Sequence, residues 1–209
     1  MGKLRHVYWI GGAPGAGKST IARRLAGRYG FELYGTDDVM QDHARRSTAA
    51  DAPYLERFMA MDMDERWLTR SPETMLETFH WFRGEAFPLI VGDLLRFPAG
   101  TPVIAEGFRL LPHLVMPLLE NADHAVWLLP TPAFREVALA SRGALWDLPG
   151  KTSDPERARL NLSRRDRMFT DRLIGECERL GCRTVELDLG VTEDEVATRI
   201  CRLFGLADG

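Results

Sequence analysis

The chain has 209 residues, of which 45% are hydrophobic, and its formal net charge at pH 7 is −3. This length fits one domain with room for an insertion, and the hydrophobic content is enough for a buried core. The slightly acidic balance argues against a general nucleic-acid binder, which is normally basic. There is no signal-peptide core and no apolar run long enough to span a bilayer, so we expect a cytoplasmic protein without nucleic-acid or membrane partners.

Cysteine and histidine usage gives no sign of a metal site or a disulfide framework. Three cysteines cannot all pair within one chain, and their spacing is not that of metal ligands, so we expect reduced thiols. Cys177 and Cys201 fit apolar helix faces, where core packing is the expected role. The five histidines are scattered without ligand spacing.

The first predicted strand, residues 7–10, runs into a complete phosphate-binding motif, G-x-x-x-x-G-K-[ST], which a helix-like segment follows. Its glycines allow backbone N–H groups to turn toward a phosphate chain, and the following helix directs its positive end at the same anion. The lysine adds a point charge, and the serine hydroxyl can ligate Mg²⁺. The motif predicts binding of ATP with Mg²⁺ by Gly12, Ala13, Pro14, Gly15, Ala16, Gly17, Lys18, Ser19 and Thr20.

The second predicted strand, residues 31–34, ends in two acidic residues, Asp37 and Asp38. Ligands of doubly wound sheets lie beyond the carboxyl ends of the strands. A carboxylate here can act as general base toward an attacking hydroxyl, or it can hold Mg²⁺ through water. The alternative is that Thr36 or Asp37 only caps the next helix. We favour Asp37 as base and metal neighbour, with Asp38 as its competitor.

Residues 42–99 are predicted to form a helical insertion rich in aromatic residues and methionine. Most of these side chains are expected to pack in a core, while a few line a substrate pocket, because pockets are themselves mostly apolar.

The third predicted strand, residues 102–105, leads into Glu106 and Gly107. An acidic residue at this point in phosphate-loop proteins lies near the metal, so Glu106 is a candidate to orient substrate or a metal-bound water. The alternative is a structural ion pair with an arginine. Gly107 allows the chain to turn sharply toward the site.

Further strands are predicted at 125–129 and 184–187, and alternation of strands with helices indicates an α/β fold with a parallel sheet covered on both faces. Residues 143–154, rich in Gly, Pro and small polar residues, are predicted to form a lid. Arginines flank it and can neutralise charge during phosphoryl transfer, although a solvated helix face is the alternative for any one of them. The candidates are Arg142, Arg164 and Arg165.

The order of these parts resembles that of P-loop kinases of the nucleoside-monophosphate-kinase-like group along nearly the whole chain. Thr36, Asp37 and Asp38 resemble the acidic motif of small-molecule kinases related to chloramphenicol phosphotransferase, zeta-type toxins and gluconate kinases, in which the aspartate matching Asp37 is the base. The Glu106-Gly107 stretch is similar to that of uridine and 2-phosphoglycerate kinases. The resemblance implies a single P-loop kinase domain over residues 1–209, with a five-stranded parallel sheet of order 2-3-1-4-5.

Two departures from nucleotide kinases favour a hydroxyl-bearing small molecule as phosphate acceptor. Either Ala138 or Leu139 stands where those kinases usually carry an adenine-stacking arginine, and residues 42–99 lack their arginine pattern. The expected function is therefore transfer of the γ-phosphate of ATP to a small-molecule hydroxyl by a monomer or homodimer. The alternatives are a nucleoside or nucleotide kinase and a non-catalytic ATP-binding regulator.

Overall fold

The computed structural model describes residues 4–141 and 148–206. Within them, five strands form one parallel sheet in the order β2-β3-β1-β4-β5, which is the order that the family resemblance implies. Each predicted strand is present with bounds shifted by no more than two residues. The strands are β1 (Val7–Gly12), β2 (Glu32–Gly35), β3 (Val103–Glu106), β4 (Ala125–Pro130) and β5 (Thr184–Leu187).

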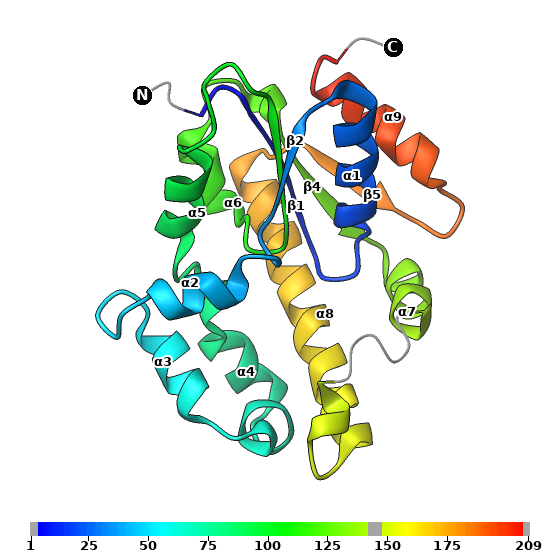
Figure 1. The fold of residues 1–209 in the computed structure, drawn as a ribbon. Helices are drawn as coiled ribbons and strands as arrows, with labels where there is room; N and C mark the ends of the chain where they lie inside the picture. Colours follow the sequence, from blue (N-terminus) through cyan, green and yellow to red (C-terminus); the bar gives the residue numbers. More distant parts are fainter. Residues whose placement is uncertain (1–3, 142–147, 207–209) are drawn as a thin grey trace.

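The two faces of the sheet bury alternate residues of the same strands, because successive side chains of a strand point to opposite sides. Trp9 and Trp127 pack with α5 (Phe87–Leu94), α6 (Pro112–Val115) and α8 (Pro155–Leu180). Ile10 and Val126 pack on the other face with α1 (Lys18–Tyr29) and α9 (Glu193–Leu203). Figure 1 shows these two layers of helices on either side of the strands.

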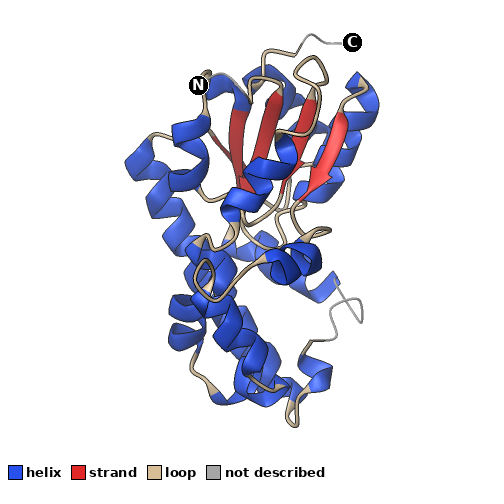
Figure 2. Ribbon diagram, turned by 60° about the vertical axis from the view of Figure 1, so that its left-hand side comes forward, coloured by secondary structure: helices blue, strands red, loops and turns tan. Residues whose placement is uncertain are grey.

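A helical unit lies beyond the carboxyl ends of the strands, where Figure 2 shows helices and no strand. It comprises most of the predicted insertion and contributes most side chains of two small apolar clusters, whereas α5, the last helix of the predicted interval, packs on the sheet. Its elements are α2 (Met40–Arg46), α3 (Pro53–Ala60), a π-helical turn (Glu65–Thr69), α4 (Pro72–Thr78) and a 3₁₀ turn (His80–Arg83).

Helix α8 connects the sheet to the helical unit. Its first half buries Ala158 and Leu162 among the aromatic residues of the unit, and its second half buries Phe169 and Leu173 against the sheet. Residues Arg165 and Asp166 therefore lie where the sheet and the helical unit meet.

Side chains cap the N-termini of three helices. Ser71 and Asp154 accept hydrogen bonds from backbone N–H groups of the first turns of α4 and α8, and Thr192 forms a capping box with Glu195. The remaining helical segments are α7 (Pro132–Ser141) and 3₁₀ turns at Met116–Leu118, Ala122–His124 and Pro149–Lys151. Among the described residues, none of the helices has the length and apolar character to cross a membrane.

All three cysteines are free, and Cys177 and Cys201 are buried in the two sheet cores, as predicted. Burial raises the pKa of the Cys177 thiol well above its ordinary range. Cys177 therefore behaves as a small apolar side chain, because a thiol that stays protonated is a poor nucleophile.

Candidate functional site

The phosphate loop joins β1 to α1 and lies at the carboxyl edge of the sheet. Lys18, the first residue of α1, is buried, and its Nζ donates a hydrogen bond to the backbone oxygen of Ala13 (2.8 Å) across the loop. The loop encloses its own lysine in this structure, with the N-terminus of α1 directed at the same space. Such an arrangement suits a phosphate chain, which accepts from backbone N–H groups and from the ammonium group.

The end of β3 contacts the start of α1. Ser19 Oγ donates to Glu106 Oε1 at 2.8 Å, so the predicted metal-binding hydroxyl and the acidic strand end are direct neighbours. Burial raises the pKa of Glu106, while Ser19 and Lys18 lower it by less. Gly107 follows with a φ of 145°, and a Cβ there would overlap the hydroxyl of Thr36, so glycine allows β3 and the end of β2 to approach closely.

The two aspartates after β2 differ in position. Asp37 lines a cavity together with Lys18 and Ser19. Burial of its carboxylate raises the pKa of Asp37, and the positive charge of Lys18 lowers it by less. The Asp38 carboxylate folds back against Gly35 and is not among the residues that line the cavity. Of the two, Asp37 is the one that a ligand in the cavity would meet.

The oxygen donors at this edge fit a hard cation. The Ser19 hydroxyl, the Glu106 carboxylate and the nearby Asp37 carboxylate are the ligand types that Mg²⁺ binds directly or through water. Within the described residues there is no cluster of three or more His, Cys, Asp or Glu side chains able to hold a metal unaided. A hydroxyl and two carboxylates leave further coordination positions of such a cation to water or phosphate oxygens.

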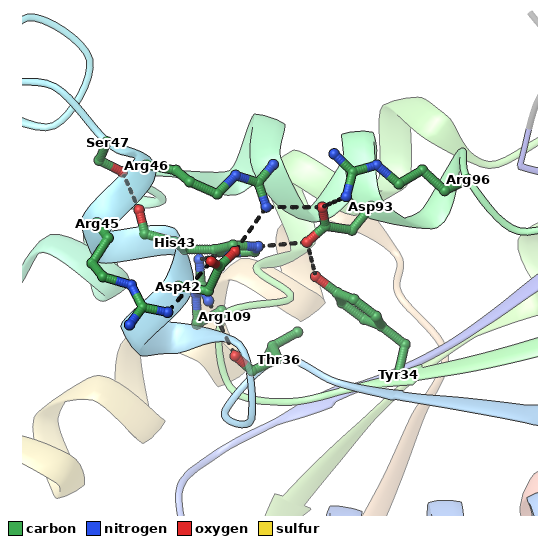
Figure 3. A network of polar contacts seen from close by, with 10 residues as sticks. All are labelled: Tyr34, Thr36, Asp42, His43, Arg45, Arg46, Ser47, Asp93, Arg96 and Arg109. Atoms are coloured by element: carbon green, nitrogen blue, oxygen red, sulfur yellow. Dashed lines mark hydrogen bonds and ion pairs between the residues drawn. The ribbon is translucent and has the colours of Figure 1, made fainter.

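A buried polar network holds the chain segment that carries Asp37 (Figure 3). Arg109, which is 2% exposed, donates to the backbone oxygen of Thr36 (3.1 Å) and to His43 Nδ1 (2.9 Å), and it stacks on Trp81. Because arginine can only donate, His43 Nδ1 accepts, and its Nε2–H donates to Asp93 (2.7 Å). Burial lowers the pKa of Arg109 to about 10.

The cavity next to the phosphate loop has a volume of about 530 Å³, within the range of small-molecule sites. One end is formed by the phosphate loop and Asp37. The other end is walled mainly by aromatic side chains from the helical unit, together with an ion pair from α8: Phe58, Trp67, Phe79, His80, Trp81, Phe82, Phe108, Arg165 and Asp166.

The three predicted arginines have different surroundings. Arg165 is 3% exposed, lines the cavity and forms an ion pair with Asp166 (2.6 Å). Arg164 is largely exposed, pairs with Glu73 (3.3 Å) and is not among the cavity-lining residues. Arg142 lies outside the described residues, as do residues 143–147 of the predicted lid. In the described remainder of the lid, Leu148 lines the cavity and the Ser153 N–H donates to Asp64 (2.7 Å).

The predicted residues of the phosphate loop fall into two groups, those that line the cavity and those buried behind it. Pro14, Gly15, Gly17 and Thr20 line the cavity with Lys18 and Ser19. Gly12, Ala13 and Ala16 are buried behind this surface, where they support the loop.

Sequence reasoning missed Arg109, His43 and Asp93. Arg109 had a usable signal, because it stands three residues after Glu106 at the same edge of the sheet. His43 and Asp93 had none, since they meet from helices 50 residues apart. The phosphate loop, the acidic strand ends and the adjoining cavity together define a nucleotide-binding site of the P-loop class.

Comparison with known proteins identifies the family. Residues 11–78 match the model of a family described as AAA domain. Adenylate kinases from two strains of Thermus thermophilus are 31% identical to this chain over 210 residues, covering 93% of this chain and 95% of theirs. The chain belongs to the P-loop kinases of the nucleoside-monophosphate-kinase-like group, a family of phosphotransferases.

Two solved structures align with this chain at low sequence identity, and one of them reaches a TM-score that indicates a shared fold. An uncharacterized protein from Eubacterium ventriosum superposes with a TM-score of 0.50 and 15% identity, covering 95% of this chain and 97% of that one. A gluconokinase from Sinorhizobium meliloti gives a TM-score of 0.46 and 16% identity, covering 98% and 94%.

The neutral state of His80 makes stability depend on pH. Burial, followed by the charges of Arg109, Arg66 and Arg165, lowers the pKa of His80 from 6.5 to about 3. As the pH falls below 6.5, the unfolded chain binds this proton before the folded chain does, so the folded state loses stability. We expect His80 to lower the free energy of unfolding by about 2 kcal/mol between pH 7 and pH 5.

Urea unfolding of wild type and His80→Gln at both pH values measures this contribution. The variant, which cannot take up the proton, should show a pH dependence smaller by about that amount. An equal pH dependence in both proteins would show that His80 titrates normally in the folded chain.

Proposed function

We propose that this protein transfers the γ-phosphoryl group of ATP to a hydroxyl of a small molecule bound at the aromatic end of the cavity. The observation that carries the proposal is the position of Asp37, which lines one continuous cavity with the phosphate loop and the aromatic wall. A hydroxyl held against that wall can lie between Asp37 and the terminal phosphate. Membership of a kinase family supports the use of ATP.

The proposed reaction uses the chain's own groups for positioning, charge and proton transfer. Loop N–H groups and Lys18, released from the Ala13 carbonyl, bind the phosphates. Asp37 takes the proton of the attacking hydroxyl. The oxygen of that hydroxyl forms a bond to the γ-phosphorus, while the bond between the γ-phosphorus and the β-phosphate oxygen breaks and leaves ADP. Ser19, with Glu106 and Asp37 through water, would hold Mg²⁺, which when bound neutralises phosphate charge.

We propose that the whole chain works as one kinase domain. The helical unit within residues 42–99 would bind the acceptor, and the lid at 143–154 would cover the phosphates and exclude water. Contact of the cavity with both parts, through Trp67 and Leu148, supports this division.

A nucleotide kinase is the second candidate, because the curated relatives carry the name adenylate kinase. It differs in the acceptor atom, which is a phosphate oxygen of a nucleoside monophosphate and does not need a carboxylate base. ADP release from ATP and Mg²⁺, measured with AMP and with a panel of hydroxylated metabolites, separates the two. A protein that binds ATP and transfers to neither acceptor class would be a regulator.

Lys18→Ala tests the nucleotide site within this assay. The substitution removes the ammonium group but leaves the sheet core intact, so ATP binding should weaken while the fold persists. Since a ligand specific for the folded state stabilises it by mass action, ATP with Mg²⁺ should raise the melting temperature of wild type and have little effect on the variant. An unchanged ATP-induced shift in Lys18→Ala would contradict the proposed nucleotide site.

A further inference from the structure

Three buried polar side chains around the aromatic end of the cavity have an atom without a hydrogen-bond partner. These atoms are Trp67 Nε1, His80 Nδ1 and Arg165 Nη1, and they account for all but one of the unpartnered buried side-chain N and O atoms in the described residues. All three side chains line the cavity and are at most 5% exposed. A buried donor left unpaired costs free energy, so such groups are uncommon away from functional sites.

The three side chains surround Phe79. The Trp67 and His80 rings lie 6.0 and 4.7 Å from that of Phe79, and the Arg165 guanidinium lies 4.9 Å from it. Asp166 accepts from Nε and Nη2 of Arg165, and Nη1 is the guanidinium nitrogen that has no partner. Two donors, an indole N–H and a guanidinium N–H, thus belong to one small region of the cavity wall.

The charge around this region favours an anion. The groups that act on the proton of His80 are Arg109, Arg66 and Arg165, all positive, and they reinforce the effect of burial in keeping the ring neutral. Asp166, which pairs with Arg165 at 2.6 Å, offsets part of this positive charge. Aromatic rings form the remaining wall, with Phe58 packed edge-on against Trp67 and tilted against His80. Flat rings bind well among such side chains, because their faces and edges carry opposite partial charges.

We propose that the phosphate acceptor combines a flat aromatic ring with an anionic oxygen group, which accepts hydrogen bonds from Trp67 Nε1 and Arg165 Nη1. This inference rests on the proposed function and specifies its acceptor. The ring lies among Phe58, Phe79 and Phe82, and the hydroxyl to be phosphorylated is directed toward Asp37 at the other end of the cavity. Trp67 and Arg165 determine specificity and take no part in proton transfer.

The test is calorimetric binding of three matched probes without ATP. Hydroxymethylbenzoate has the ring, the carboxylate and the hydroxyl, benzyl alcohol lacks the carboxylate, and hydroxymethylcyclohexanecarboxylate lacks the flat ring. We expect the first probe to bind about tenfold more tightly than either of the others, because it alone satisfies both the donors and the aromatic wall. Equal binding of all three probes would overturn the inference.

Trp67→Phe keeps an aromatic ring and removes only the indole N–H and part of its volume. It should weaken binding of hydroxymethylbenzoate by about tenfold and leave binding of benzyl alcohol nearly unchanged. Arg165→Lys, which keeps the charge beside Asp166 but loses the guanidinium fork, is the second variant and should act in the same direction. Unchanged affinity for hydroxymethylbenzoate in both variants would contradict the assignment.

Trp127→Phe is the matched control, because the Trp127 indole N–H donates to the backbone oxygen of Leu110 (2.9 Å) in the sheet core. This control should lower the melting temperature and leave probe binding unchanged, since its N–H has a structural partner. AMP, measured beside the probes, combines a flat adenine ring with a phosphate group as the anion. Tighter binding of AMP that depends on Trp67 would identify the anion as a phosphate.

Binding and transfer can fail separately. Probe binding that depends on Trp67, without phosphoryl transfer to any hydroxyl, would support the proposed aromatic, anionic ligand class and contradict the proposed function. Transfer to a neutral aliphatic hydroxyl compound, unaffected by Trp67→Phe, would support the proposed function and contradict the proposed aromatic, anionic acceptor class.

Discussion

Asp37→Asn should retain ATP binding and lose phosphoryl transfer to the hydroxyl acceptor by about 10²–10⁴-fold, the usual contribution of a positioned general base. The amide keeps the size of the carboxylate but cannot accept the proton that the hydroxyl releases. The ATP-induced rise in melting temperature reports binding, and the single-turnover rate of ADP formation reports transfer. The transfer rate of wild type should also fall as the pH decreases through the pKa of Asp37, which burial raises above its ordinary value of 3.8.

Asp38→Asn is the control, because the Asp38 carboxylate lies against Gly35 and is not part of the cavity lining. It should lose less activity than Asp37→Asn. An inactive Asp38→Asn beside an active Asp37→Asn would reverse the two roles. Normal transfer by both variants would make Glu106 the next candidate, since its carboxylate contacts Ser19.

The sheet and the phosphate loop were predictable because their signals are local. Each strand is a short apolar run with turn residues on either side, and the phosphate-binding motif occupies consecutive positions between β1 and α1. The parallel arrangement follows from alternation of strands and helices, and the order β2-β3-β1-β4-β5 from the family resemblance, which the structure confirms. Once these are known, Asp37 and Glu106 are expected at the same edge.

The residues of the cavity wall were not predictable, because they depend on the rotation of each helix about its own axis, here called its phase. Arg164 and Arg165 are adjacent in sequence and about 100° apart around α8, so one of them can face the cavity while the other faces solvent. The packing of Ala158, Leu162 and Phe169 sets that phase and buries Arg165. The sequence shows both arginines as equivalent, and it does not reveal which aromatic residues of the helical unit point to the cavity.

The second large effect is expected from Asp93, at the centre of the network in Figure 3. Its carboxylate accepts from Tyr34 of β2 (3.1 Å) and from His43 (2.7 Å) and Arg46 (3.1 Å) of α2, so it joins three elements. Partial burial raises the pKa of Asp93, but these hydrogen bonds lower it by more. The group is therefore a carboxylate at neutral pH and contributes stability that is lost as the pH falls through its lowered pKa.

Asp93→Ala should lower the free energy of unfolding by about 3 kcal/mol, because it leaves His43 and Tyr34 with unpaired donors in a largely buried site. For a domain of this size that corresponds to a melting temperature lower by roughly 6–12 °C. Thermal unfolding measures the effect. The loss should extend to phosphoryl transfer, since His43 orients Arg109 and Arg109 holds the Thr36 carbonyl immediately before Asp37.

Arg96→Ala is the matched control, because Arg96 pairs with the same carboxylate at 3.5 Å but its side chain is 73% exposed. Exposed ion pairs contribute little, so this variant should change the stability by less than about 0.5 kcal/mol and leave transfer unchanged. Equal effects of Asp93→Ala and Arg96→Ala would mean that the network is only a surface charge cluster. A destabilised Asp93→Ala variant with full transfer activity would show that the network stabilises the packing of α2 and α5 but does not position Asp37.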